Sequence, residues 1–258
     1  MLGRKTASQD SSALSETPRD EEKRASVLRL IAAWCVHLFT ATGAVCCLLS
    51  IDAGVDRNWE LAFAWLALAV FIDAVDGFFA RLVRVKEVLP GFNGDQLDNV
   101  VDYASYVLVP AFLLLRAEIL PDAWAWWAAA AILISSAFQF CQESAKTSDH
   151  YFKGFPSYWN VAVLYLLAMD LSPTTNLVII MTLVVLVFVP IKYVYPSRTP
   201  RFRPLTLTLA SVWGLLLCVI VMTLRSTPPW LVWSSLLFVV YYVLLSFYLS
   251  WERTYHTD

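Results

Sequence analysis

Long apolar segments alternate with short polar ones along most of the chain. Four of the apolar segments contain no charged residue: Leu30–Ile51, Ala123–Cys141, Leu205–Leu224 and Trp230–Ser250. Two more have a similar length but contain carboxylates: Trp59–Ala80 and Leu97–Leu115. Because a helix needs about 20 mostly apolar residues to cross the hydrocarbon core of a bilayer, each of these segments predicts a transmembrane helix.

The stretch from Tyr158 to Tyr195 is long enough for two shorter helices. Ser172–Asn176 separates them, and we expect Pro190 to kink the second. The expected fold is therefore all-α, a polytopic membrane bundle of about eight transmembrane helices. We expect a flexible polar tail over residues 1–29, a single transmembrane catalytic domain over 30–251, and a short tail over 252–258.

The composition agrees with a membrane protein and excludes several other classes. Of the 258 residues, 59% are hydrophobic and only 16% are charged, whereas soluble domains average about 45–50% and about 25%. The net charge of −2 provides no basic field for nucleic acid. All five cysteines lie in apolar segments, which argues against a disulfide framework.

The distribution of basic residues predicts the orientation of the bundle. Of the 19 Lys and Arg residues, all but three fall in the two tails or in the loops that follow even-numbered spans. The three exceptions are Arg57, Arg116 and Arg225. Because Lys and Arg accumulate in cytoplasmic loops, we expect both termini in the cytosol.

Two pairs of aspartates lie inside predicted spans and are the candidate functional residues. Charged residues at membrane depth are energetically costly, so they usually serve a function. Asp73 and Asp76 are three residues apart and Asp98 and Asp102 are four apart, so each pair shares one helix face. Both pairs flank the same cytosolic loop, which predicts that the four carboxylates converge near the cytosolic surface. Oxygen ligands of this kind suit Mg²⁺ or Mn²⁺. A structural carboxylate cluster or a cation path is the alternative.

Small and basic residues accompany these carboxylates. Gly77, Ala80 and Gly94 lie on the carboxylate faces, where they would let a ligand or a helix approach closely. Arg81 is a candidate phosphate donor, although the cytosolic bias of basic residues also explains it. Asp95 lies about 20° from Asp102 in helical phase, and we expect it to act as an acidic residue at a helix N-terminus.

Together these residues read Asp73-x2-Asp76-Gly77-x2-Ala80-Arg81, then twelve residues, then Gly94-x3-Asp98-x3-Asp102. The pattern resembles the signature of the CDP-alcohol phosphotransferases, and the surrounding spans fit the helical membrane core of that family. The intervening stretch, Leu82–Asn93, is longer than in most members. It is similar to the bacterial branch that condenses CDP-diacylglycerol with free choline to give phosphatidylcholine and CMP.

The resemblance implies a role for each motif position. The implied ligands of two Mn²⁺ or Mg²⁺ ions are Asp73, Asp76, Asp98 and Asp102. Asp102 matches the proposed general base of the family. The positions that line the CDP pocket are Gly77, Ala80 and Gly94, with Arg81 contacting phosphate or positioning a carboxylate. The resemblance also implies a homodimer in the inner membrane of a bacterium, with the active site facing the cytosol.

Two polar residues in the first span are further candidates for nucleotide binding. Many relatives have an Asn-x-x-Thr pattern beside the nucleotide, and here His37 and Thr40 take those places. Their spacing puts both on one helix face. Hydrogen bonds within the bundle are the alternative explanation.

Choline presents a quaternary ammonium, which binds aromatic faces, often beside a carboxylate. Aromatic and polar residues gather in the cytosolic loop after the fourth span and at the start of the next helix. The candidates are Glu143, Tyr151, Phe155, Tyr158 and Trp159, with Tyr103 and Tyr106 as second candidates. An interfacial loop anchored by aromatic residues is the alternative.

Two other functions agree with these residues. In the first, the enzyme catalyses the same reaction with serine, inositol phosphate or glycerol phosphate as the acceptor. The phosphorylated acceptors require additional basic residues near the site. In the second, the protein is a carboxylate-lined cation transporter. Metal-dependent release of CMP without ion flux would exclude the transporter.

Overall fold

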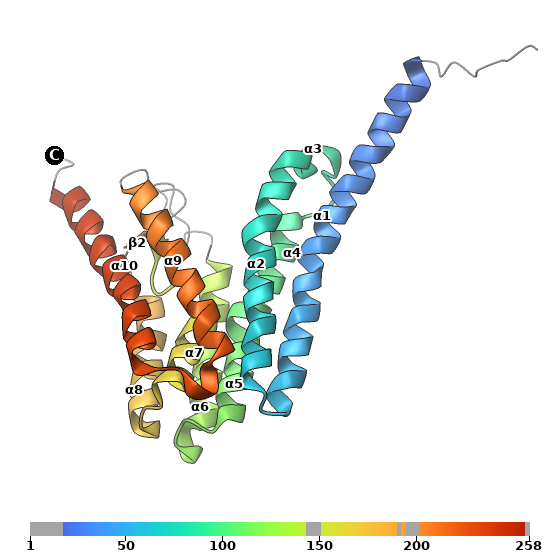
Figure 1. Cartoon of the computed structure of the whole chain (residues 1–258). Coiled ribbons are helices and arrows are strands. Elements are labelled where there is room, and N and C mark those ends of the chain that lie inside the picture. Colours follow the sequence, from blue (N-terminus) through green and yellow to red (C-terminus); the bar gives the residue numbers. More distant parts are fainter. Residues whose placement is uncertain (1–17, 143–150, 190–191, 195–201, 256–258) are drawn as a thin grey trace, which may run out of the picture.

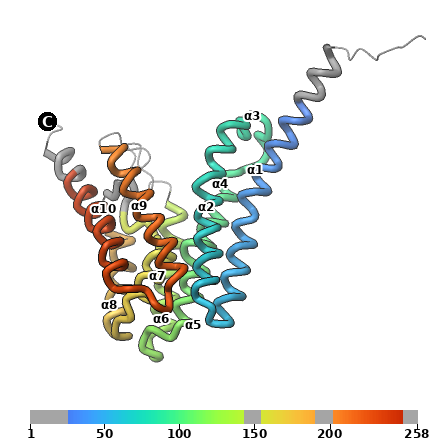
Figure 2. Tube along the Cα trace, viewed as in Figure 1, coloured from blue at the N-terminus to red at the C-terminus, as the bar shows by residue number. Residues whose placement is uncertain are grey.

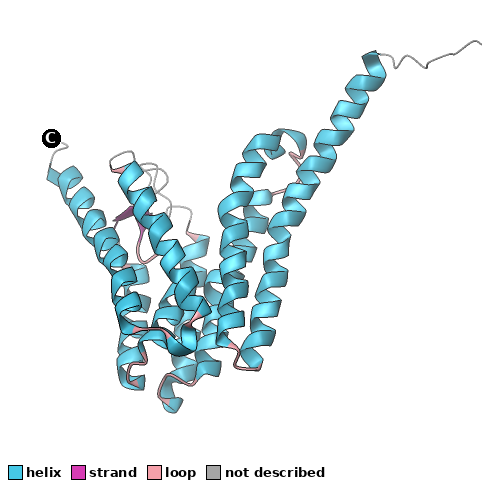
Figure 3. Ribbon diagram, in the orientation of Figure 1, coloured by secondary structure: helices cyan, strands magenta, loops and turns pink. Residues whose placement is uncertain are grey.

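The computed structural model describes residues 18–142, 151–189, 192–194 and 202–255 of the chain. The regular elements of these residues are helices and two short strands, which pair in antiparallel register (Figure 3). The strands are β1, Tyr151–Lys153, and β2, Lys192–Val194. The helical class expected from the sequence is confirmed, and the β1–β2 ribbon is an addition that the sequence analysis did not predict.

The helices follow the predicted apolar segments in order (Figure 1). Their bounds are α1 Pro18–Val55, α2 Trp59–Val83, α3 Val85–Val88, α4 Gly94–Tyr103, α5 Val109–Ala117, α6 Asp122–Cys141, α7 Trp159–Met169, α8 Pro173–Phe188, α9 Arg203–Met222 and α10 Pro229–Tyr255. A π-helical segment, η1, spans Ala104–Leu108, and a 3₁₀ segment, η2, spans Leu224–Ser226.

Side-chain caps explain where several helices begin. Asn58, Asn93 and Ser172 cap α2, α4 and α8, and each accepts a hydrogen bond from the backbone N–H three residues further on. Pro173 then occupies the first turn of α8, where its missing N–H costs nothing. The break between α7 and α8 therefore ends at Ser172, whereas the sequence analysis placed it over Ser172–Asn176. Helix α8 ends at Phe188, before Pro190 can kink it.

Six helical segments are long and apolar enough to cross a membrane, judged by length and composition among the described residues. They are Ser26–Val55, Trp59–Val83, Gly94–Ala117, Asp122–Cys141, Arg203–Met222 and Pro229–Tyr248. Helices α7 and α8 are apolar but shorter, which accounts for the difference from the eight spans expected. Helix α1 begins at Pro18, ahead of the predicted span and inside the segment expected to be a flexible tail.

Close helix packing places the carboxylate-bearing helices beside α1. Helices α4 and α5 form one continuous helix through η1, and α1 crosses this helix at glycines. A Cβ atom on Gly43 would lie 2.6 Å from Cγ1 of Val101, and one on Gly54 would overlap the Leu113 side chain. Small residues at such crossings let backbones approach closely in membrane bundles. The trace in Figure 2 shows α1 and α2 side by side on one flank of the molecule and α9 and α10 on the other.

The three arginines that the sequence analysis assigned to the opposite side from the other basic residues gather at one end of the bundle. Arg57 forms an ion pair with Glu118, and Arg225 forms one with Glu60 at 3.3 Å. Arg116 donates a hydrogen bond to the last backbone carbonyl of α1 at 3.4 Å. Figure 1 shows the start of α1 and the end of α10 at the opposite end of the bundle. The structure therefore separates these arginines from both described ends of the chain.

Candidate active site

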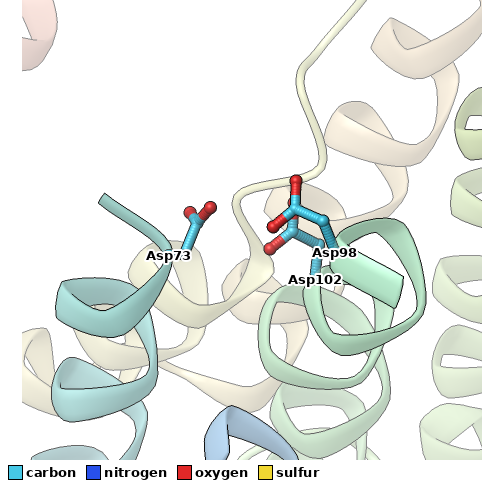
Figure 4. Close-up of side chains that lie close together, drawn as sticks. All are labelled: Asp73, Asp98 and Asp102. Carbon is cyan, nitrogen blue, oxygen red and sulfur yellow. The ribbon is translucent and has the colours of Figure 1, made fainter. Parts of the chain in front are cut away.

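Three of the four motif aspartates converge in space. Asp73 on α2 and Asp98 and Asp102 on α4 point toward a common region (Figure 4). One carboxylate oxygen from each lies within 4.8 Å of the others, and all three side chains are partly buried. Convergent oxygen ligands of this kind on rigid helices suit Mg²⁺ or Mn²⁺ better than Zn²⁺. The arrangement can therefore hold a divalent cation.

The fourth motif aspartate, Asp76, faces α1. It is only 7% exposed and accepts a hydrogen bond from the Thr40 hydroxyl at 2.7 Å. The Thr40 hydroxyl also lies 3.3 Å from the backbone carbonyl of Val36, one turn earlier. Burying a carboxylate is unfavourable unless donors surround it. Thr40 therefore orients Asp76, which links the first span to the carboxylate helix.

Replacing Thr40 by Val is expected to lower the turnover number about tenfold, since a hydrogen bond to a charged group is worth about 1.5–3 kcal/mol. Valine keeps the shape of the side chain but removes the donor that orients Asp76. The turnover number at saturating divalent metal is the measurement. Thr42→Val is the matched control, because Thr42 is exposed and bonds only a carbonyl of its own helix. Equal turnover in both variants would contradict the role of Thr40.

Gly77 and Arg81 continue the face of Asp73 toward the C-terminal end of α2. Successive residues of this set are four apart, so they lie above one another along α2. A Cβ atom on Gly77 would lie 3.4 Å from Nη1 of Arg81, so the guanidinium extends back over the glycine. Ala80, seven residues after Asp73, packs in a small apolar cluster with residues of α1 and α3. The guanidinium thus lies beside Gly77, on the side of the helix that carries Asp73.

Gly94 packs directly against His37. A Cβ atom on Gly94 would lie 2.6 Å from Cε1 of His37, which only a glycine accommodates. The imidazole is 7% exposed and lies against the Phe92 ring, with 4.4 Å between ring centroids. Its Nε2 atom is buried without a hydrogen-bond partner among the described residues. Such an atom is costly unless a ligand or water satisfies it, so His37 provides an unused polar group beside the N-terminus of α4.

Asp95 lies in the first turn of α4 but outside the aspartate cluster. Its carboxylate forms an ion pair with Lys86 of α3 at 2.7 Å, and both side chains are largely exposed. An acidic residue in the first turn also interacts favourably with the helix dipole. The observed position agrees with the expectation of an acidic residue at a helix N-terminus.

The two tyrosines that follow Asp102 point in different directions. Tyr106 lies in the π-helical turn and donates a hydrogen bond from its hydroxyl to Asp73 at 2.8 Å. Tyr103 faces α6, where its hydroxyl donates to the Leu133 carbonyl at 2.9 Å. π-helical turns are rare and are frequently found at functional sites. Of the two second candidates, the structure therefore brings Tyr106 to the carboxylates.

The structure describes only part of the expected aromatic site. Glu143 and the side chain of Tyr151 lie outside the described residues. Tyr158 is 36% exposed, and its ring centroid is 5.8 Å from that of Tyr106. Trp159 is fully buried, and its indole N–H donates to the Ser136 hydroxyl at 2.7 Å. Phe155 packs on Trp159 with 5.2 Å between ring centroids, so these two rings lie in the core and Tyr158 lies at its edge.

A buried polar network anchors this segment, and the sequence analysis missed it. The Gln139 amide donates to the Phe155 carbonyl at 2.6 Å, and its oxygen accepts a hydrogen bond from Ser157. The Ser157 hydroxyl is also 3.0 Å from that of Ser136. Ser136 and Gln139 are three residues apart in an otherwise apolar span, a spacing typical of polar contacts between membrane helices. The spacing of these two polar residues could therefore have predicted a contact between helices.

Comparisons with known proteins identify the family of the chain. The family model for CDP-alcohol phosphatidyltransferase matches residues 25–196 of the chain. A protein of Rhizobium meliloti named phosphatidylcholine synthase is 38% identical over 85% of this chain and 91% of its own length. A protein of the same name from Legionella pneumophila is 43% identical over 87% of this chain and 89% of its own length. Another, from Pseudomonas aeruginosa, is 40% identical over 78% of this chain and 80% of its own length. The chain therefore belongs to the CDP-alcohol phosphatidyltransferase family.

Proposed function

We propose that the chain is a metal-dependent phosphatidylcholine synthase, which transfers the phosphatidyl group of CDP-diacylglycerol to free choline and releases CMP. The observation that carries the proposal is the eight-position motif, because three of its four aspartates converge on two neighbouring helices. The length of the stretch Leu82–Asn93 and the similarity to proteins named phosphatidylcholine synthase support choline as the acceptor.

The aspartate site is proposed to hold a pair of divalent cations. Its donors are carboxylate oxygens, and Asp76 lies three residues from Asp73 on the same helix. The proposed ligands of two Mn²⁺ or Mg²⁺ ions are Asp73, Asp76, Asp98 and Asp102. When bound, such ions would neutralise the pyrophosphate and stabilise the charge that develops on departing CMP.

Asp102 is the proposed general base. Its carboxylate takes the hydroxyl proton of choline, as a base within hydrogen-bond reach does. The choline oxygen then forms a bond to the phosphorus that carries the diacylglycerol. The bond from that phosphorus to the oxygen of CMP breaks, and CMP leaves with the electron pair. Thr40 and Tyr106 hold Asp76 and Asp73 in orientation during this step.

The nucleotide is proposed to bind between α1, α2 and the N-terminus of α4. The residues proposed to line this CDP and phosphate site are His37, Thr40, Gly77, Ala80, Arg81 and Gly94. The buried, unpartnered Nε2 atom of His37 supports this placement, because a nucleotide base or ribose would supply the missing hydrogen bond. Arg81 supplies a charged donor to phosphate on the face that carries Asp73.

The proposed choline site lies at the segment that precedes α7. Tyr158 is its best-supported member, because its ring is partly exposed and close to Tyr106. Glu143 and Tyr151 remain proposed members on the basis of the sequence. Phe155 and Trp159 are proposed to support the site, since their rings pack on each other in the segment that carries Tyr158.

We further propose eight membrane crossings with both termini in the cytosol. Helices α7 and α8 are the two crossings beyond the six longer helical segments. In the extended segment before α7, the Phe155 backbone is hydrogen-bonded to Gln139 and Leu186, as a polar backbone at membrane depth requires. The arginine cluster at one end and the two described chain ends at the other support this orientation. The proposed location is the inner membrane of a bacterium, with one catalytic domain over 30–251 between tails over 1–29 and 252–258. Family resemblance alone supports a homodimer.

Purified full-length protein is expected to make phosphatidylcholine and CMP from CDP-diacylglycerol and labelled choline when Mn²⁺ or Mg²⁺ is present. A chelator should abolish the reaction, and the added metal should restore it, because the carboxylate cluster would otherwise repel the pyrophosphate. Choline should exceed serine, inositol phosphate and glycerol phosphate in an acceptor panel. Absence of phosphatidylcholine with every metal, or cation flux in vesicles without CMP release, would contradict the proposal.

A further inference from the structure

Tyr106 and Tyr158 form a pair of aromatic rings beside the aspartate cluster, although 52 positions separate them in the chain. Their centroids are 5.8 Å apart and their planes are inclined by 47°. Inclined rings open as a wedge, so a cation at the open side can contact both faces. Ring faces attract cations within about 6 Å of the centroid, and quaternary ammonium groups are recognised in this way.

The hydrogen bond from Tyr106 to Asp73 adds negative charge to this wedge. The Tyr106 hydroxyl donates to the Asp73 carboxylate at 2.8 Å, which moves electron density from the hydroxyl group toward the ring. Both the aspartate and the polarised ring then favour a neighbouring cation. Tyr106 also follows Asp102 by four residues, which is about one turn along the same continuous helix. Only two carbons separate the nitrogen and the oxygen of choline, so one choline molecule can reach both residues.

The protein holds Tyr158 in position through its backbone. The N–H of Phe155 donates to the Leu186 carbonyl of α8 at 2.9 Å, and the Phe155 carbonyl accepts from Gln139 of α6. Ser157, with a φ of 54°, turns the chain into α7 and bonds to Gln139. Positive φ in a residue other than glycine is unfavourable and is often found where a site is held rigid. Tyr158 therefore follows a segment that two helices hold in place.

We propose that Tyr106 and Tyr158 bind the quaternary ammonium of the acceptor and select choline over less methylated amino alcohols. This assignment rests on the proposed function. It makes Tyr106, rather than the fully buried Trp159, the ring that faces the ammonium together with Tyr158. The hydroxyl of the bound choline would then lie toward Asp102, and its methyl groups would contact the two rings.

Single replacements of each ring by leucine test the assignment in the full-length protein. Tyr158→Leu and Tyr106→Leu are each expected to raise the KM for choline about tenfold, since the rings supply the cation attraction. The inhibition constant of tetramethylammonium, which carries the ammonium without the hydroxyl, should rise by a similar factor. The KM for CDP-diacylglycerol should stay unchanged in Tyr158→Leu, whereas Tyr106→Leu also removes the donor to Asp73. Tyr158→Phe keeps the ring and should retain the wild-type KM for choline.

Tyr103→Phe is the matched control on the same helix. Tyr103 faces α6 and packs on Phe140, away from the aspartates, so its replacement should leave the KM for choline unchanged. Tyr158→Leu carries the test if Tyr106→Leu fails to fold, because Tyr158 is partly exposed.

The outcomes separate this assignment from the proposed function. Unchanged values for choline and tetramethylammonium in folded leucine variants would overturn the assignment while the protein remained a phosphatidylcholine synthase. A wild-type protein that makes no phosphatidylcholine would instead overturn the proposed function. A loss of preference for choline over ethanolamine that is confined to the leucine variants would support the ammonium site.

Discussion

Replacing Asp102 by Asn should lower phosphatidylcholine synthesis by about a thousandfold or more, because general-base catalysis alone contributes about 10²–10⁴-fold. Asn keeps the size of the side chain but cannot take the choline proton, and it removes one of three converging carboxylates. The protein should still fold, since removing one charge from the cluster relieves repulsion among the others. Incorporation of labelled choline measures the activity, and thermal unfolding in detergent measures the stability.

Asp95→Asn is the matched control for this experiment. Asp95 is on the same helix, two turns before Asp102, but its exposed carboxylate pairs with Lys86 rather than with the cluster. Exposed ion pairs contribute little to stability, so both activity and melting temperature should stay near the wild-type values. Comparable losses of activity in the two variants would show that the cluster does not mark the catalytic carboxylates.

Replacing Gly154 by Ala should cause the largest loss of stability, lowering the apparent melting temperature by about 10 °C or more. Gly154 has a φ of 81°, which L side chains rarely adopt, and a Cβ atom there would overlap the backbone carbonyl of Val187. A backbone atom cannot move aside as a flexible side chain does. The variant should therefore separate the extended segment from α8 and displace Tyr158, which lies four residues further on.

Two measurements and one control define this prediction. The apparent melting temperature in detergent reports the loss of stability, and the KM for choline should rise with it in the protein that remains folded. Gly91→Ala is the control, because the structure places no atom within 4 Å of the added Cβ at that position. It should change the melting temperature by less than about 2 °C, as surface substitutions generally do. An unchanged melting temperature for Gly154→Ala would contradict the packing of this segment against α8.

Several features of the fold follow from the sequence because they depend on neighbouring residues only. The length and apolar character of each segment predicted the helices, and α6 covers Asp122–Cys141 against a prediction of Ala123–Cys141. The same reasoning expected two shorter helices between Tyr158 and Tyr195, and the structure starts the second at Pro173, after the Ser172 cap. It also placed the start of α1 too late, since polar residues continue the helix back to Pro18.

In the candidate site, too, relations within one helix could be predicted from the sequence, whereas contacts between helices could not. Helical periodicity alone predicted that Asp98 and Asp102 share a face and that Gly77 lies on the face of Asp73, because these relations lie within one helix. The sequence also identified Thr40 and His37 as candidates, but their partners depend on how α1 crosses α2 and α4. The structure decided that Thr40 bonds Asp76 and that His37 packs on Gly94.

The sequence by itself determined the apolar segments and the eight-position motif, and it predicted the candidate site residues and the orientation of the bundle. Only the tertiary structure decided which of them meet. It turned Asp76 toward α1, separated Tyr106 from Tyr103 at the π-helical turn, and brought Tyr158 to Tyr106. The physical reason is that periodicity fixes the direction of a side chain around its own axis. Contacts between helices depend on close packing at glycines and on buried polar bonds between distant segments.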